Sequence, residues 1–429
     1  MKPRSMIARY ALLICATLAI LTLTPGCGGG KHDEFVPYGV ATPAPTQAPT
    51  PTPEELLGFV FCANATSNNV TVFGQNSSTC LLYTSPGHLW QLANAPMSAG
   101  PIALLSDPTA LAHHYYVLTN AASGTANIGL YNPNLETGAL SLTATYDAGG
   151  TILAGDISIY THYLYVLVNR TGALVIRGFK LNTDGTLGAG FDAATGGNLR
   201  LTTNPQIRAM IFPQDQTSTD LIVVPNNDAN ANNLVSFSQN AANGVLTEAA
   251  TASLADTPAA LVANPSINTP GVTLNTATLY ASTFNGANGG ITAYTVGIAG
   301  GFTVGATTPL SGPGNKLKMH DNDNTLALIS ASGGTANQLQ VFAVNPDGSL
   351  GAQNGTNLSV GTGAEHVTSI GLDIDTIWLY VGTDANTIHA FSLDIVTQTL
   401  AAETLPTTSC GGTLPVCLES LPAVLPGKK

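Results

Sequence analysis

Charged residues are scarce in this 429-residue chain, at 9% of the total, and basic residues are the scarcest, with 13 Lys and Arg against 25 Asp and Glu. So few cations exclude a protein that holds nucleic acid by charge. The low charge, with no sustained heptad, also excludes a coiled coil. Because Lys and Glu are rare while Gly, Asn and Thr abound, we expect few helices. Hydrophobic residues make up 44% of the chain, which favours a large all-β protein with a packed core over disorder.

Sequence motifs for metals and for common catalytic machinery are also missing. No His-x-x-His or Cys-x-x-Cys spacing occurs, so we expect no transition metal. The run Asp321-Asn322-Asp323-Asn324 lacks the Gly and the Glu of a calcium loop and is interpreted as a turn between strands. There is no Gly-x-Ser-x-Gly elbow and no phosphate loop. We therefore predict neither a metal nor another cofactor.

The N-terminus has the pattern of an export signal. Three basic residues precede an apolar run from Ala11 to Thr24 that is too short to span a membrane comfortably. The run ends at Thr24-Pro25-Gly26-Cys27, which resembles the lipobox of bacterial lipoproteins, in which the Cys is acylated. An ordinary signal peptide or an uncleaved anchor is the alternative. Gly28 stands where inner-membrane retention signals usually have Asp, so we expect export and a lipid anchor at Cys27 in the outer membrane or at the cell surface.

The chain then divides into three expected parts. Residues 1–26 would be the signal peptide and residues 27–56 a flexible stalk. Within the stalk, Thr42–Pro53 contains five Pro and four Thr and can form neither a helix nor a central strand. Residues 57–429 would form one globular β domain. This order suits a protein that touches a membrane only through its lipid anchor.

One unit recurs along the globular part. A short β-rich triplet returns every 48 to 58 residues, and its middle residues are Val60, Tyr116, Tyr165, Ile222, Tyr280, Leu328 and Tyr380. Repetition of this length is typical of propellers and solenoids. In most units an Asn, Asp or Ser stands four positions after the centre of the triplet, where it favours a turn, and an alternating strand follows.

Several units also contain a tight hairpin. Asp184-Gly185, Asn243-Gly244 and Asp347-Gly348 are strong hairpin signals. A further strand leads through a Pro-containing or Gly-rich connection into the next unit, which gives four strands per unit. We therefore predict an all-β fold, a seven-bladed β-propeller with four antiparallel strands per blade, and keep a solenoid as the alternative.

These motifs together carry a family resemblance. The Tyr-Val start, the Asn turn, the aromatic residue in the third strand and the Gly-x-Leu hairpin resemble the lactonase-type seven-bladed propellers, which include bacterial 6-phosphogluconolactonases and fungal muconate-lactonizing enzymes. The segment Tyr116–Asn120 is also similar to the Tyr-Val-Thr-Asn repeat propellers. The resemblance covers about Leu57 to Glu419. It implies the fold more strongly than the reaction, because its motifs are mostly strand and turn residues.

Charged and polar residues at the entries of the inner strands are the candidate site, because the innermost strands of a propeller surround a central channel. The candidates for catalysis are Arg208, Glu365 and His366, and the candidates for binding are Arg170, Gln206, Lys316 and Lys318. Most belong to the fourth, sixth and seventh units, and a ring of units would bring them together although they are distant in sequence. Arg170 would lie on a loop of the third unit on the same face.

A lactonase would need a base that activates water and a donor that stabilises an oxyanion. Glu365 or His366 would be the base, and Arg208 or Lys316 the donor. The alternative is that these charges only pair with one another at the channel mouth. Lactonase-type propellers usually carry a Pro-Arg-His-like sequence at the last inner strand, whereas this chain has Ala364-Glu365-His366, which weighs against the activity. The other histidines are less suitable, and His389 falls at an alternating position of a third strand.

Four cysteines remain once Cys15 is assigned to the leader and Cys27 to the lipid. In an exported protein four cysteines allow three pairings. Placing the C-terminal strand beside Phe59–Asn64 sets Cys62 roughly opposite Cys417. We therefore favour disulfides Cys62–Cys417 and Cys80–Cys410, and the local alternative is Cys62–Cys80 with Cys410–Cys417.

The sequence as a whole predicts a lipid-anchored, extracytoplasmic and monomeric propeller that binds a small ligand or a partner protein at its channel mouth. A lactone hydrolase is the first alternative, and a structural repeat protein of the cell surface is the second. The sequence does not identify the ligand.

Overall fold

The fold is seen in a computed structural model that describes residues 56–76, 89–106, 114–121, 126–158, 161–195, 199–202, 204–210, 221–228, 231–264, 276–285, 288–312, 314–322, 325–332, 337–362, 365–373, 378–394, 397–401 and 407–422. Within these ranges the regular structure is β throughout, and no helix suited to crossing a membrane occurs there. The predicted signal peptide, nearly all of the predicted stalk, Cys27 and Cys80 lie outside the described residues.

The strands form six four-stranded sheets and one five-stranded sheet. The first sheet contains, in spatial order, β29 (Pro415–Pro422), β1 (Leu56–Asn64), β2 (Asn69–Asn76) and β3 (Leu89–Pro96). The next contains β4 (Gly100–Ser106), β5 (Tyr115–Asn120), β6 (Ala126–Pro133) and β7 (Leu140–Asp147). The third contains β8 (Thr151–Ser158), β9 (Tyr163–Arg170), β10 (Ala173–Lys180) and β11 (Phe191–Thr195). The fourth contains β12 (Arg208–Met210), β13 (Leu221–Asp228), β14 (Ala231–Gln239) and β15 (Leu246–Ser253).

The remaining sheets follow the same order along the chain. The fifth contains β16 (Thr257–Ala263), β17 (Thr276–Asn285), β18 (Asn288–Gly297) and β19 (Phe302–Leu310). The sixth contains β20 (Gly314–Asn322), β21 (Thr325–Ser332), β22 (Gln338–Val344) and β23 (Leu350–Ser359). The five-stranded sheet contains β24 (Val367–Leu372), β25 (Trp378–Thr383), β26 (Thr387–Asp394), β27 (Thr399–Leu400) and β28 (Thr408–Ser409). Its two shortest strands, β27 and β28, both pair with β26, on the edge of β26 that β25 leaves free.

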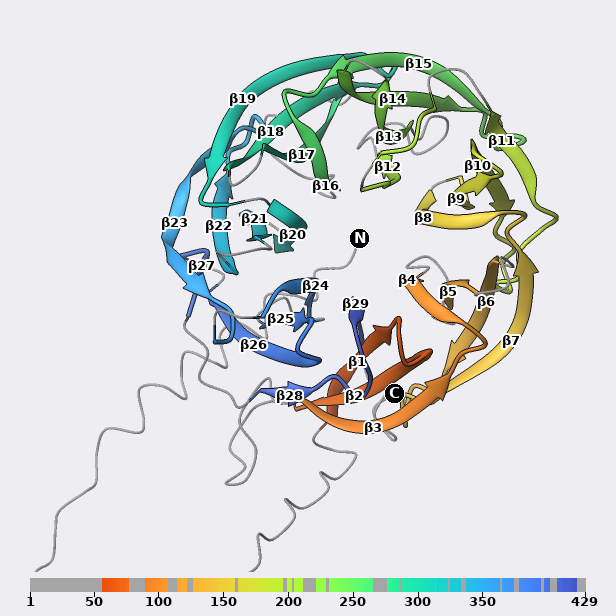
Figure 1. Ribbon diagram of the computed structural model, residues 1–429, viewed down its shortest axis with the longest axis vertical. Coiled ribbons are helices and arrows are strands. Elements are labelled where there is room, and N and C mark those ends of the chain that lie inside the picture. The colour runs from red at the N-terminus through yellow and green to blue at the C-terminus, as the bar shows by residue number, and fades with distance from the viewer. Residues whose placement is uncertain are drawn as a thin grey trace, which may run out of the picture. The chain divides into compact units, whose positions relative to one another are not determined.

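The sheets stand around a common centre like the blades of a propeller (Figure 1). All strand pairs are antiparallel, and consecutive inner strands contact one another around the ring, in the order β4, β8, β12, β16, β20, β24, β29 and back to β4. The C-terminal strand β29 is the inner strand of the sheet that β1 begins, so the two ends of the globular part share one sheet. The predicted all-β propeller with four-stranded antiparallel blades is confirmed.

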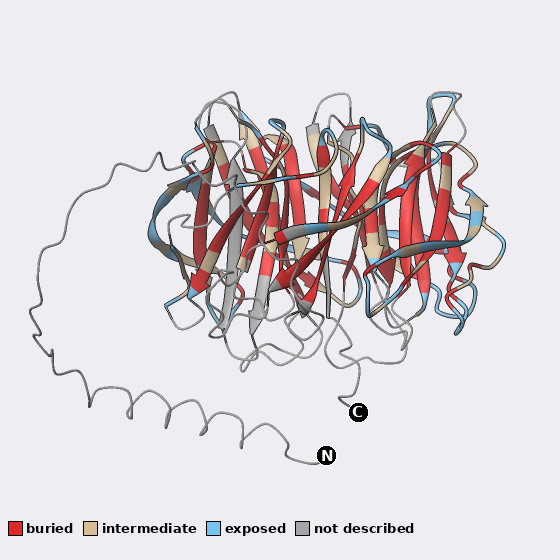
Figure 2. Ribbon diagram, turned by 90° about the horizontal axis from the view of Figure 1, so that it is seen from below, coloured by how far each residue is buried: buried red, intermediate tan, exposed pale blue. Residues whose placement is uncertain are grey.

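The core lies between neighbouring blades. The second strands are buried along nearly their whole length, as in β5 and β9, while outer strands such as β7 and β19 are mostly exposed (Figure 2). The recurring triplets found in the sequence are these second strands, which explains why they are apolar on both faces rather than alternating. The repeated signal therefore marks the part of each blade that is sandwiched between its neighbours.

The predicted hairpin glycines adopt the expected turns and also contact the preceding blade. Gly185, Gly244 and Gly348 have φ angles of 79°, 72° and 81°, in the left-handed region that suits glycine. Their carbonyl oxygens each accept a 2.8 Å hydrogen bond from a buried tyrosine hydroxyl of the preceding blade. The pairs are Tyr116 with Gly185, Tyr165 with Gly244 and Tyr280 with Gly348. We call these contacts the tyrosine latches.

The predicted Cys62–Cys417 disulfide is not found, and strand register gives the reason. β1 and β29 pair with Cys62 opposite Leu418, and Ala63 opposite Cys417. Because side chains alternate between the two faces of a sheet, this one-residue offset puts the two thiols on different faces. Cys62, Cys410 and Cys417 are all free thiols among the described residues, and Cys410 is close to Cys62 rather than to Cys417.

Candidate functional site

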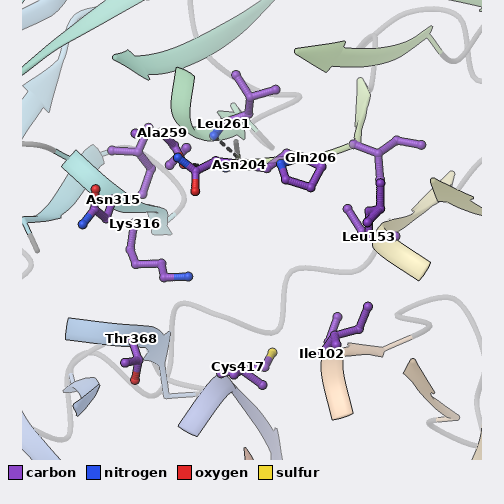
Figure 3. Close-up of a pocket in the computed structure, with 18 of the residues that line it drawn as sticks. Ile102, Leu153, Asn204, Gln206, Ala259, Leu261, Asn315, Lys316, Thr368 and Cys417 are labelled. Atoms are coloured by element: carbon purple, nitrogen blue, oxygen red, sulfur yellow. Dashed lines mark hydrogen bonds between the residues drawn. The ribbon is translucent and has the colours of Figure 1, made fainter. Parts of the chain in front are cut away.

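The inner strands enclose a cavity of about 870 Å³ at the centre of the ring. Each sheet described above contributes residues to its wall, from its inner strand or from the segment that leads into that strand (Figure 3). A cavity of this volume is in the range of pockets that hold small organic molecules. The centre of the ring is therefore the candidate site.

β-Bulges in six inner strands build much of the wall. Each bulge inserts one extra residue opposite the second strand of its blade, and the extra residues are Ile102, Leu153, Ala259, Asn315, Thr368 and Val416. All six line the cavity. A bulge bends its strand locally and redirects a side chain, so repeated bulges explain how regular strands can present a ring of residues to the centre.

The wall has chemically different sides. Ile102 and Leu153 lie close together on one side, whereas Asn315, Lys316 and Thr368 lie on the opposite side (Figure 3). A ligand with an apolar part and a polar part would match this division.

The Lys316 side chain points into the cavity (Figure 3). No described carboxylate forms an ion pair with its ammonium group. Burial lowers the pKa of Lys316 from its ordinary value. The nearby Cys417 opposes this change, and the Arg208 charge adds to it. A desolvated amine without a described counter-charge would gain stability from an anion in the cavity.

Lys318 and Glu419 form an ion pair at the inner strands β20 and β29. The Lys318 ammonium lies 3.5 Å from Glu419, and about 30% of each side chain is exposed. Glu419 lines the cavity and is accompanied by Cys417, whose pKa is raised to about 11, first by burial and then by the Glu419 charge. Lys318 is thus already neutralised, unlike Lys316 two residues earlier.

Arg208 lines the cavity, but its guanidinium group donates hydrogen bonds to backbone carbonyls of the protein. Its Nε donates to the Leu261 carbonyl at 2.9 Å and its Nη1 to the Ile207 carbonyl at 3.1 Å. A carboxylate oxygen of Asp156 lies 3.9 Å from Nη1. Burial raises the pKa of Asp156 while the Arg208 charge and backbone N–H groups oppose that rise. Arg208 thus combines a structural role with a place in the wall.

Gln206 joins two inner strands. Its Nε2 donates to the Ala259 carbonyl and its Oε1 accepts from the Leu261 N–H, both at 2.7 Å. Asn204, two residues earlier, donates to the Pro258 carbonyl at 3.2 Å. With Arg208 these alternating side chains attach the segment before β12 to β16. Gln206 therefore lines the cavity and also connects two neighbouring blades through its hydrogen bonds to β16.

Glu365 and His366 are not among the residues that line the cavity. One Glu365 oxygen, Oε2, accepts hydrogen bonds of 2.9 Å from Thr383, Thr387 and His389. Burial raises the pKa of Glu365, but these donors outweigh burial and the pKa is lower than usual. The His366 backbone N–H donates to Asp384 at 2.7 Å. Glu365 is thus the centre of a partly buried polar network that includes the buried Thr383 and His389.

Arg170 belongs to a separate cluster on β9, β10 and β11. Its two Nη atoms each bind one oxygen of Asp192 at 2.8 Å, and its Nε donates to the Gly149 carbonyl. Arg177 adds a second cation 3.3 Å from Asp192. Arg170 does not line the cavity, so the structure separates it from Arg208 and Lys316.

Of the sequence-based candidates, Arg208, Gln206 and Lys316 line the cavity, Lys318 pairs with a lining residue, and Arg170, Glu365 and His366 lie elsewhere. Sequence reasoning missed Asn315 and Thr368, because nothing in the sequence marks a bulge. It also set aside His389, the partner of Glu365. The signal for His389 was a polar residue between the apolar Ile388 and Ala390. The His389 side chain is only 2% exposed. No group of three metal-binding side chains forms among the described residues.

Comparison with known proteins supports the fold alone. No family model and no curated protein matches the chain. Two similar solved structures are candidate 6-phosphogluconolactonases, from Bacteroides fragilis and Bacteroides uniformis. Both have a TM-score of 0.64 and 18% identity, with 87% and 86% of this chain covered and 100% of theirs. A protein from Lactobacillus plantarum matches with a TM-score of 0.61 and 15% identity, over 85% of this chain and 99% of its own. At such identities the likeness concerns the propeller architecture.

Proposed function

We propose that this protein is an exported, lipid-anchored, seven-bladed propeller whose central cavity binds a small molecule with an anionic group. The observation that carries the binding proposal is Lys316, a cation that faces a cavity of about 870 Å³ without a described counter-charge. In this interpretation the five-stranded sheet is the seventh blade, with β27 and β28 together as its outer strand.

The division of the wall supports a ligand with two ends. A carboxylate or phosphate at Lys316 would accept charge-assisted hydrogen bonds, which are about twice as strong as neutral ones. Asn315 and Thr368 would add neutral hydrogen-bond partners beside it. The Ile102 and Leu153 side would cover an apolar part of the ligand, which favours organic anions over inorganic phosphate.

A binding screen with a matched lysine variant tests the proposal. The probes are aliphatic and aromatic monocarboxylates and phosphate monoesters, with binding measured by calorimetry on the purified globular part. Lys316→Gln should weaken the best probe by roughly 10- to 100-fold, because a hydrogen bond to a charged group contributes about 1.5–3 kcal/mol. The control Lys180→Gln, at an exposed residue of β10, should leave affinity unchanged. Equal affinity in wild type and Lys316→Gln would refute the anion site.

The pH dependence of binding gives a second check. An anion is bound by protonated Lys316, whose pKa is below its ordinary value because of burial. Affinity for a carboxylate probe should therefore be full below that lowered pKa and decline as pH rises through it, at a lower pH than for an ordinary lysine. In Lys316→Gln the decline should disappear. A decline that persists in the variant would assign the titration to another group.

Lactone hydrolysis is the second candidate function, and its support is the pair of candidate 6-phosphogluconolactonases among the similar structures. Arg208 or Lys316 would stabilise the oxyanion. The proposed bases, Glu365 or His366, do not line the cavity, which weighs against catalysis there. Turnover of a lactone panel would support this function if Arg208→Ala lowers the rate by roughly 10²–10³-fold in folded protein. Binding of organic anions without turnover of any lactone would favour the first proposal.

Acylation at Cys27 is tested by fractionation. The wild type should enter the membrane fraction and Cys27→Ser the soluble fraction, because two or more acyl chains are needed for stable anchoring. A wild-type protein that is already soluble and unacylated would refute the anchor and leave the binding proposal intact.

A further inference from the structure

We propose that Cys62 and Cys410 are oxidised to a disulfide that joins the two ends of the propeller ring. Cys62 lies on β1, the first strand of the globular part, and Cys410 follows β28, shortly before the final strand β29. This pairing is neither of the two considered from the sequence.

The two thiols are already neighbours. Both residues are buried in one apolar cluster with Tyr380, Ile388 and Leu418. The Cys62 thiol donates to Asn64 Oδ1 at 3.4 Å and the Cys410 thiol to the Gly412 carbonyl at 2.8 Å. Two buried thiols in one cluster can reach the short Cβ–Cβ distance of a disulfide by a local rearrangement. Cys417 faces another environment, with its sulfur 3.6 Å from the Leu104 carbonyl.

The backbones around the pair are held in place by one side chain. The Asn64 amide nitrogen donates to the Cys62 carbonyl at 3.2 Å and to the Cys410 carbonyl at 3.3 Å. The Cys410 N–H in turn donates to the Asn386 carbonyl at 2.9 Å. The segment that carries Cys410 is therefore fixed against β1 and β26, which keeps the thiols facing each other.

The environments of the two thiols suit the two steps of thiol–disulfide exchange. The neighbouring Cys62 thiol lowers the pKa of Cys410 to about 7, although burial opposes this change. Burial raises the pKa of Cys62, and the neighbouring Cys410 acts in the same direction. Cys410 is thus the more readily formed thiolate, which is the attacking species in exchange.

The oxidant would be a disulfide of a thiol oxidoreductase or of oxidised glutathione. The Cys410 thiolate attacks one sulfur of that disulfide, forms a mixed disulfide and releases the other sulfur as a thiolate. Cys62 then loses its proton to solvent and attacks the Cys410 sulfur, which releases the second thiolate. One protein disulfide forms, one oxidant disulfide is reduced, and two protons pass to the released thiolates. Because both residues are buried in the folded ring, we infer that the reaction occurs as the last blade docks.

Peptide mapping of the full-length protein tests the pairing directly. Cells that express the chain with its own leader are quenched with N-ethylmaleimide, and the protein is denatured and digested without reductant. We expect one linked peptide pair containing Cys62 and Cys410, about 2 Da lighter than the two thiol peptides, and N-ethylmaleimide on Cys417. N-ethylmaleimide on both Cys62 and Cys410, or a bond from either one to another cysteine, would overturn the proposal.

Refolding in a defined redox buffer separates this proposal from those on export and ligand binding. Protein made without the leader is refolded with oxidised and reduced glutathione, and the same Cys62–Cys410 bond should form there. Failure to form it in both preparations refutes the disulfide, whereas failure of Cys27 acylation or of anion binding leaves it unaffected.

Thermal unfolding measures the effect of the bond. Reductant should lower the Tm of the oxidised wild type by several degrees, because the bond closes a loop around almost the whole ring. The double variant Cys62→Ala/Cys410→Ala should show no shift with reductant, and the control Cys417→Ala should keep the wild-type shift. An equal shift in the double variant would exclude this pair as its cause. If the double variant does not fold, the peptide map of the wild type still decides.

Discussion

Successive blades contact one another in one way, and the two ends of the ring contact one another in a different way. We call the second region, where β1 meets β29 and the segment between β28 and β29, the ring closure. Along the ring, a hairpin glycine of one blade rests against the preceding blade. Gly138, Gly244 and Gly348 lie against second-strand residues, Phe59, Tyr163 and Thr278, and Gly185 lies against His114, just before β5. Gly300 lies against Ala249 and Ser236, on the two outer strands of its preceding blade. Three of these contacts carry a tyrosine latch, and Ser236 donates to the Gly300 carbonyl at 2.7 Å.

The closure instead depends on a polar network that involves the segment between β28 and β29. The buried amide of Asn64 donates to Cys410, Thr71 and Asn69, and the Leu414 N–H donates to the Asn386 side chain at 2.8 Å. Backbone bonds from Ala65 to Leu414 and from Thr66 to Thr413 add to it.

The difference follows from connectivity. Neighbouring blades along the chain are covalently linked, and a small glycine contact recurs at five of their interfaces among the described residues. The ring closure brings together the two ends of the ring, which are separated by more residues than any other contacting strands. Bringing them together therefore carries the largest entropic cost of loop closure in the fold. Several hydrogen bonds with partners from separate segments therefore fix the ring closure.

The largest expected effect breaks a contact between successive blades. In Gly185→Ala the new Cβ would lie 2.1 Å from a ring carbon of the buried His114, and the backbone has a φ of +79°. Left-handed backbone costs an L-residue about 1–2 kcal/mol, and overpacking adds roughly 1–3 kcal/mol. The free energy of unfolding, measured by guanidinium titration, should therefore fall by about 2–5 kcal/mol.

Gly172→Ala is the matched control for the clash. Gly172 has a φ of +90° but no atom within 4 Å of the added Cβ, so only the backbone cost of about 1–2 kcal/mol applies. Similar losses for the two variants would show that the hairpin glycines are needed for turn geometry and not for contact with the neighbouring blade.

The repeated strands and hairpins of the blades were predictable from the sequence, and the contacts at the ring closure were not. The triplets around Tyr116, Tyr165 and Tyr280 and the hairpins Asp184-Gly185 and Asn243-Gly244 each recur, so they identify blades and turns. The sequence does not show that a tyrosine of one unit bonds the hairpin of the next, because that contact depends on the spacing between blades. Whether Cys62 faces Cys417 depends on the register between β1 and β29, and a shift of one residue reverses the answer. The sequence repeat does not determine that register.

The candidate site shows the same limit. Arg208, Gln206 and Lys316 were recognised because entries of inner strands face the centre in any propeller. Asn315 and Thr368 reach the cavity through bulges, and a bulge depends on backbone pairing rather than on residue type. Glu365 was recognised as an unusual charge, but its pairing with the buried His389 depends on the path of the segment that precedes β24.

A middle-sized effect is expected at the closure. Asn64→Ala removes a buried donor and leaves the Cys62 and Cys410 carbonyls with fewer hydrogen bonds, so it should cost about 2–3 kcal/mol. Asn120 occupies the same repeat position and binds both the N–H and the carbonyl of Ile152, but it is only partly buried. Water can replace its bonds, and Asn120→Ala should cost about 1 kcal/mol. A larger loss at Asn120 than at Asn64 would contradict the special role of the closure network.

The smallest effect is expected from removing one latch hydroxyl. Tyr165→Phe keeps the buried ring and deletes only the 2.8 Å hydrogen bond to the Gly244 carbonyl, so unfolding should become easier by about 1 kcal/mol. Tyr163→Phe is the control on the same strand, because its hydroxyl makes a long 3.5 Å contact with the Ala242 carbonyl and should contribute almost nothing. Guanidinium titrations of the two variants side by side measure the difference. If Tyr165→Phe matches the control, ring packing alone holds successive blades together. A clear loss would instead assign part of the inter-blade stability to the tyrosine latch, a hydrogen bond found at Tyr116, Tyr165 and Tyr280 among the described residues.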